Sequence, residues 1–146
     1  MKTLITSFVL TTMLSVVHGQ DQSVYIEGDD SYQFSVKQIN VSPGELVEIT
    51  LKTISKLPKN QMAHNWVLLK QDVNAEEFVN QCIQHKANDY IDPELTDRII
   101  AYTDMLGDGE RDSITFTAPE TKGVYTYVCT FPGHFLLGMK GKLIVE

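Results

Sequence analysis

Residues 129–139 read CTFPGHFLLGM and hold a thiol, an imidazole and a thioether in one short segment. Cys129, His134 and Met139 follow one another at steps of five residues. Cys129 ends a β-prone run, so we expect sheet backbone to fix its sulfur. A Pro-Gly turn brings His134 back toward that sulfur, and the glycine before Met139 lets the chain bend again. The segment therefore predicts a loop that gathers three potential metal ligands.

A histidine outside this loop completes the ligand set. His64 stands in residues 62–66, which read MAHNW. Cu(I) prefers soft sulfur ligands and Cu(II) prefers imidazole, so one thiolate, two imidazoles and a distant thioether serve both oxidation states. These residues predict a mononuclear type 1, or blue, copper site, with Met139 as the weak axial ligand.

Other interpretations of the same residues stay open at this stage. Zinc also binds His2Cys sets, but catalytic zinc needs an open position and a nearby base, and residues 129–139 contain no Asp or Glu. A copper-delivery module usually exposes Met and His clusters, whereas this thiolate lies in a closed loop. A redox enzyme would need a second metal site, and of the three histidines after residue 19 only His85 is left unassigned. A disulfide would remove the thiolate, so we expect Cys82 to be a free, buried residue.

Short β-prone runs separated by turn signals dominate the rest of the chain. They lie at 23–27, 33–39, 46–52, 65–69, 98–102, 113–117, 124–129 and 140–145. One segment, 72–86, instead places Phe78, Val79, Cys82 and Ile83 on one face of a helix, after an Asn74 cap. This pattern predicts an all-β fold, a Greek-key sandwich or barrel of about eight strands with one short helical insertion. We expect the single tryptophan, Trp66, in its core.

The N-terminal sequence predicts export, and the net charge excludes one class of partner. Lys2 and the apolar run after it predict a cleaved signal peptide at 1–19, followed by one domain at 20–146. No other stretch reaches the ~20 apolar residues of a membrane span. The chain has 12 basic and 19 acidic side chains, a formal net charge of −7, which argues against nucleic acid as a partner.

The stretches LPKN at 57–60, MAHNWVL at 62–68, GERDS at 109–113, CTFPGH at 129–134 and MKG at 139–141 resemble azurins, blue-copper proteins of the cupredoxin family. The resemblance covers nearly all of the predicted domain. It implies a cupredoxin fold, one copper ion, and a monomeric periplasmic electron carrier that is not an enzyme. It also implies transient redox partners such as c-type cytochromes, copper nitrite reductase or a terminal oxidase.

The same resemblance implies a role for individual residues. His64, Cys129 and His134 would be the equatorial ligands, Met139 the axial one, and the carbonyl of Ala63 would approach the metal from the opposite side. Residues around the ligands would support them: Asn65 and Thr130 between the two ligand segments, and the N–H of Phe131 toward the thiolate. His134 would be the electron port, inside an apolar docking patch. The residues of that docking patch are His134, Met62, Phe131, Phe135, Leu136 and Leu137. For Leu136 and Leu137, core packing is the alternative.

Two departures from azurins stand out. The step from His134 to Met139 is five residues, as in auracyanin and plastocyanin, where azurins typically have four. The azurin disulfide is also missing, because the positions near Gln22 and Gly44 are not cysteines. Such a bridge typically contributes ~2–4 kcal/mol, so this fold is expected to hold without that contribution.

Overall fold

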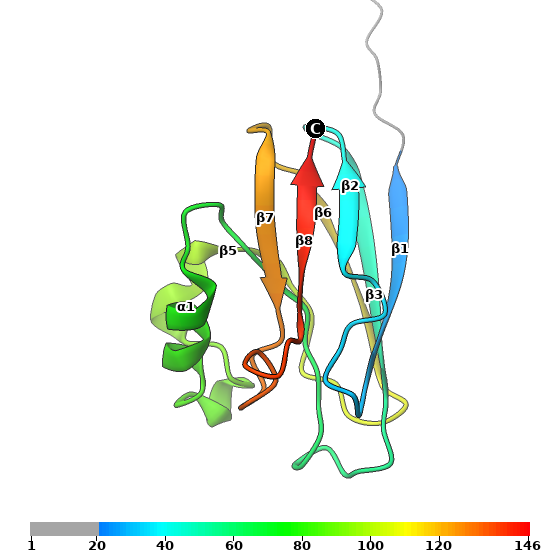
Figure 1. The fold of residues 1–146 in the computed structure, drawn as a ribbon, viewed down its shortest axis with the longest axis vertical. Helices are drawn as coiled ribbons and strands as arrows, with labels where there is room; N and C mark the ends of the chain where they lie inside the picture. Colours follow the sequence, from blue (N-terminus) through cyan, green and yellow to red (C-terminus); the bar gives the residue numbers. More distant parts are fainter. Residues whose placement is uncertain (1–20) are drawn as a thin grey trace, which may run out of the picture.

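Two β-sheets face each other across a hydrophobic core in a computed structural model that describes residues 21–146 (Figure 1). The predicted signal peptide lies outside the described residues. One sheet has the order β1-β3-β6 and the other β2-β8-β7-β4-β5. The strands are β1 (Gln22–Asp29), β2 (Gln38–Val41), β3 (Leu46–Ile54), β4 (Val67–Leu69), β5 (Ile99–Tyr102), β6 (Arg111–Thr117), β7 (Gly123–Val128) and β8 (Lys140–Val145). The prediction of an eight-stranded all-β sandwich is confirmed.

Alternation of side chains explains why these strands form two sheets around one core. In β3, Val47, Ile49 and Leu51 are 0% exposed, while Glu48 between them is exposed and Thr50 is half-buried. Burying such a side chain fully contributes about 1.5–3 kcal/mol. Trp66, also 0% exposed, lies in the core as predicted, and it joins the two sheets by packing against Phe116 of β6 and Tyr127 of β7.

The strand predicted at 33–39 differs in the structure. Phe34 makes only a single bridge to Gly28 of β1, and the N–H of Ser35 donates to the carbonyl of Glu27. The chain then leaves this sheet, and β2 pairs in parallel with β8 of the other sheet. The β-prone run is thus divided between the two sheets, with residues 35–37 outside both.

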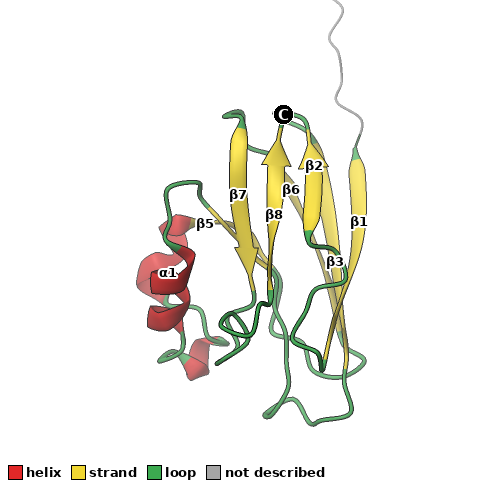
Figure 2. Ribbon diagram, viewed as in Figure 1, coloured by secondary structure: helices red, strands yellow, loops and turns green. Residues whose placement is uncertain are grey.

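The predicted helical insertion is confirmed as α1 (Ala75–Cys82). Its N-cap is Asn74, whose side chain accepts a hydrogen bond from the N–H of Glu77 at 3.0 Å. Two short 3-10 helices, η1 (Lys86–Asn88) and η2 (Pro93–Arg98), follow it and were not predicted. Figure 2 shows these helices together at one side of the sandwich.

The insertion builds a second hydrophobic core against the outer side of the larger sheet. Phe78, Val79 and Cys82 of α1 share this core with Val128 of β7 and with Phe135. Tyr127 and Cys129, which flank Val128 in sequence, belong to the main core. The strand that leads to Cys129 is therefore covered on both faces.

No helix among residues 21–146 is long and apolar enough to cross a membrane.

Candidate metal centre

His64, Cys129 and His134 bring their donor atoms together in the interior of the protein. The two Nδ1 atoms are 3.2 Å apart, and the Cys129 sulfur lies 3.5 Å from Nδ1 of His134 and 4.0 Å from Nδ1 of His64. A point equidistant from these three atoms lies about 2.1 Å from each, close to the length of a metal–imidazole bond. The three side chains therefore form a cradle of the right size for one transition-metal ion.

The loop folds back on itself through its own backbone. The N–H of His134 donates to the carbonyl of Phe131 at 3.1 Å, and the N–H of Met139 donates to the carbonyl of His134 at 3.0 Å. The N–H of Cys129 donates to the carbonyl of Met139 at 3.2 Å. Gly133 has a φ of 85°, a left-handed conformation that glycine adopts freely. Thus the three ligand residues of the loop are fixed to one another before any ion binds.

His64 is held by a different part of the chain. Its N–H donates to the carbonyl of Leu106 at 2.9 Å and its carbonyl accepts from the N–H of Leu106 at 2.8 Å. Met139 lies beside His64, and both side chains border Gly28. A Cβ added at Gly28 would come within 2.9 Å of both the His64 ring and the Met139 methyl group. The glycine leaves room for the fourth predicted ligand next to the other three.

The centre is almost closed to solvent, and burial controls its protonation. His64, Cys129 and Met139 are 0% exposed and His134 is 2% exposed. Burial lowers the pKa of both histidines from 6.5 to about 4, and at His64 the nearby Asp29 opposes this shift. Burial raises the pKa of the Cys129 thiol to about 12, against hydrogen bonds from the backbone of Asn65 and Phe131. At neutral pH both imidazoles are therefore neutral and free to bind a metal.

Asn65 connects the two ligand segments. Its side-chain N–H donates to the hydroxyl of Thr130 at 2.8 Å, and its side-chain oxygen accepts from the backbone N–H of Thr130 at 2.9 Å. Both residues are buried. This pair links the residue after His64 to the residue after Cys129.

The donor set fits copper. A thiolate and a thioether suit Cu(I), imidazoles suit Cu(II), and three strong donors with one weak axial sulfur are typical of blue copper sites. Cys82 and Cys129 are both free and buried, as predicted, so no disulfide competes for the Cys129 sulfur.

The predicted docking patch separates into exposed and buried members. Leu136 and Leu137 are 72% and 57% exposed, so core packing does not account for them. Met62, Phe131 and Phe135 are buried, with exposures of 2%, 9% and 8%. Of the six residues of the predicted patch, only these two leucines present large apolar surface to solvent. Ala63 is buried as well, and its carbonyl contact with the metal stays a prediction.

Two residues that border the site were not predicted from the sequence. Gly28 borders His64 and Met139, and the Tyr32 ring contacts His134 with their centroids 5.1 Å apart. Gly28 lies near the end of β1 and Tyr32 in the turn that follows it, roughly a hundred residues before the loop, and nothing in their local pattern marks them. Only the pairing of β1 with β3 and the return of the chain at Phe34 bring them here.

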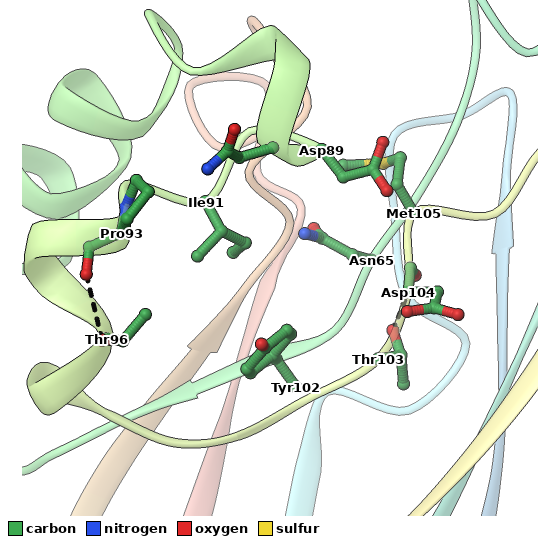
Figure 3. A pocket seen from close by; sticks show the side chains of 10 residues that line it. Asn65, Asp89, Ile91, Pro93, Thr96, Tyr102, Thr103, Asp104 and Met105 are labelled. Carbon is green, nitrogen blue, oxygen red and sulfur yellow. Dashed lines mark hydrogen bonds between the residues drawn. The ribbon is translucent and has the colours of Figure 1, made fainter.

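A surface pocket of about 370 Å³ lies beside the centre (Figure 3). It is bounded by Asn65, Asp89, Ile91, Tyr102 and Met105, among others, between the helical insertion and β5. None of the four predicted ligands lines it. The pocket therefore reaches Asn65 but not the donor atoms.

Comparison with known proteins agrees with this geometry. A family model described as copper binding proteins, plastocyanin/azurin family, matches residues 20–146. Azurin-1 of Alcaligenes xylosoxydans xylosoxydans is 42% identical over 125 residues, which cover 83% of this chain and 95% of that protein. Azurin of Pseudomonas aeruginosa is 34% identical over 141 residues, 94% of each chain.

Among solved structures, dithionite-reduced auracyanin of the photosynthetic bacterium Roseiflexus castenholzii superposes with a TM-score of 0.75 at 31% identity. The match covers 88% of this chain and 98% of that chain. The sandwich is thus a cupredoxin fold, and His64, Cys129, His134 and Met139 form its type 1 copper site. The chain belongs to the plastocyanin/azurin family of copper-binding proteins.

Proposed function

We propose that this protein is an azurin-like type 1 copper electron carrier that works in the periplasm and passes single electrons between redox proteins. The observation that carries the proposal is the burial of all four ligands, at 0% exposure for three and 2% for His134. A substrate has no open path to the metal, whereas an electron can tunnel through a buried ligand. The protein is accordingly a carrier rather than an enzyme.

The residues of the chain prepare the site for this role. Bound copper supplies one-electron redox chemistry. His64 and His134 offer neutral imidazoles, because burial lowers the pKa of each to about 4. Cys129 gives up its proton only when a cation takes that proton's place, because burial raises the pKa of its thiol to about 12. The Asn65–Thr130 pair keeps the two ligand segments at a fixed separation, so little has to move when the charge changes.

Spectroscopy on the purified protein tests the proposal directly. Adding Cu(II) to the metal-free chain should produce an intense blue thiolate-to-copper band. Cys129→Ser should abolish that band, while the matched variant Cys82→Ser, which removes the other buried thiol, should keep it. A wild-type protein that stays colourless with copper and prefers zinc would refute the proposal.

Partner docking is proposed to use the two exposed leucines. Leu136 and Leu137 stand two and three residues after His134, so an apolar partner surface placed on them lies close to the ligand. Such contacts bury little area and separate quickly, which suits a shuttle. We expect c-type cytochromes, copper nitrite reductase or a terminal oxidase as the classes of partner, and a monomeric carrier.

Electron self-exchange tests the docking patch. Leu137→Asp should slow self-exchange of the copper-loaded protein, because it places a charge within the patch. Leu46→Asp is the matched control: Leu46 is 43% exposed and starts β3 at the opposite end of the sandwich (Figure 1). Equal rates in the two variants would contradict the assignment of the patch.

A further inference from the structure

His134 is the metal ligand closest to the surface, and aromatic rings surround it. Its ring centroid lies 4.7 Å from that of Phe131, 4.9 Å from that of His64 and 5.1 Å from that of Tyr32. His64 is itself a ligand and Phe131 belongs to the ligand loop. Tyr32 is the one of the three that comes from outside the centre.

Tyr32 occupies an unusual backbone conformation. Its φ is 60°, in the left-handed region that bulky residues seldom adopt. The turn around it is fixed, because its N–H donates to the carbonyl of Asp29 at 3.2 Å and the N–H of Ser31 donates to the Asp29 side chain at 2.9 Å. A strained residue that persists beside a functional group points to a role for its side chain.

The next residue joins this turn to the ligand loop. The side-chain N–H of Gln33 donates to the carbonyl of Leu137 at 3.2 Å. The turn that carries Tyr32 and the loop that carries His134 are thereby held together next to the ring contact. The Tyr32 ring meets the imidazole at an interplanar angle of 66°, an edge-to-face arrangement that aromatic pairs prefer.

The orientation of His134 shows what the Tyr32 ring covers. Nδ1 of His134 faces the Cys129 sulfur and the His64 ring, so the inner edge of the imidazole is taken up by the centre. Tyr32 is half-buried, so its side chain meets both the imidazole and solvent, and His134 retains only 2% exposure. The ring is therefore placed to cover part of the outer side of His134.

We propose that Tyr32 is a positioning residue of the metal centre: its ring closes the outer side of His134 and holds that imidazole turned toward the other ligands. The proposal rests on the proposed function, since it takes His134 to be a ligand. Tyr32 thereby restricts access to the centre and slows the loss of the bound ion.

Chemical modification of the metal-free protein tests this closure. Diethyl pyrocarbonate acylates accessible imidazoles, and peptide mass spectrometry gives the rate at each histidine. His85, whose side chain is 37% exposed, is the internal reactive standard, and His64, at 0% exposure, is the protected one. In the wild type, His134 should react as slowly as His64.

Tyr32→Gly is the informative variant, because glycine suits a φ of 60° and removes only the ring. It should speed modification of His134 by roughly tenfold or more, since the covering contact is lost, and leave His64 slow. Tyr32→Phe should match the wild type, and so should Tyr25→Ala, which removes a 51% exposed tyrosine from β1.

Three results would overturn the proposal. They are a wild-type rate at His134 in Tyr32→Gly, a joint rise at His64 and His134 that signals general loosening, and a Tyr32→Phe variant as reactive as Tyr32→Gly. Copper extraction by a chelator gives a second measurement: Tyr32→Gly should stay blue but lose copper faster than Tyr32→Phe, and equal rates count against the proposal. A wild type that never turns blue would refute the proposed function alone, because the modification assay uses metal-free protein.

Discussion

The Asn65–Thr130 pair offers the sharpest test of how the two ligand segments are held. Asn65→Ala removes both hydrogen bonds, of 2.8 and 2.9 Å, and leaves the buried N–H of Thr130 without a partner. Each buried group left unsatisfied costs about 1–3 kcal/mol, so we expect a loss of about 2–4 kcal/mol in the free energy of unfolding. That is a large share of the ~5–15 kcal/mol that stabilises a typical domain.

Thr130→Val is the matched partner in a double-mutant cycle. It removes only the hydroxyl that accepts from Asn65 and keeps the bond from the Thr130 N–H, so it should cost about 1–2 kcal/mol. Each single substitution removes the hydrogen bond between the Asn65 side chain and the Thr130 hydroxyl, whereas the double variant loses that bond only once. The coupling energy should therefore be about 0.5–1.5 kcal/mol.

Urea unfolding of the four metal-free proteins gives these values, because copper would add its own binding energy to the folded state. The same variants loaded with copper should show a shifted blue band, because loss of the side-chain bonds lets the backbone N–H of residue 65, which donates toward the Cys129 sulfur, change its position. Additivity of the two single substitutions to within about 0.3 kcal/mol would refute the view that this pair ties the segments together.

Three further predictions concern the ligands themselves. The pKa of His64 and of His134 falls from 6.5 to about 4 on folding, so the unfolded chain binds more protons in this range. Urea unfolding of the metal-free protein should therefore show stability declining from pH 6.5 toward pH 4, by at most about 3 kcal/mol per pH unit. A flat profile would contradict the burial of neutral imidazoles. Gly28→Ala places a Cβ 2.9 Å from both the His64 ring and the Met139 methyl group. It should lower the free energy of unfolding, measured in urea, by about 1–3 kcal/mol and weaken the copper affinity measured by titration. An unchanged affinity would mean that Met139 is free to move. Met139→Leu should keep the blue colour and raise the reduction potential measured by voltammetry, and an unchanged potential would place Met139 away from the metal.

Much of the centre could be predicted because its ligands lie in two short, distinctive segments. The spacing of Cys129, His134 and Met139 and the motif around His64 depend on local chemistry that the sequence displays directly. Strands with one buried face, such as β3, could also be predicted, because apolar and polar side chains alternate along them. Prediction failed where the partner lies far away in sequence: the run at 33–39 divides between two sheets, and Tyr32 meets His134 only through the tertiary fold.

The docking patch shows a different limit. Apolar residues next to a metal loop look alike in sequence whether they line a core or a surface. Phe135 packs into the second core beneath α1, whereas Leu136, its neighbour, is 72% exposed. One step along the chain separates them, and only the position of the helical insertion decides which side chain it covers.

The two cores on either side of β7 give the copper site a remote tuning element. Val128 packs against α1, while the next residue, Cys129, supplies the sulfur, so one peptide unit separates the helix from the ligand. A changed side-chain volume at Phe78 or Val79 should therefore shift that peptide unit and, with it, the hydrogen bonds that reach the sulfur. Selection or design can thus adjust the reduction potential from the back of the sheet, with the four ligands and the exposed leucines left as they are.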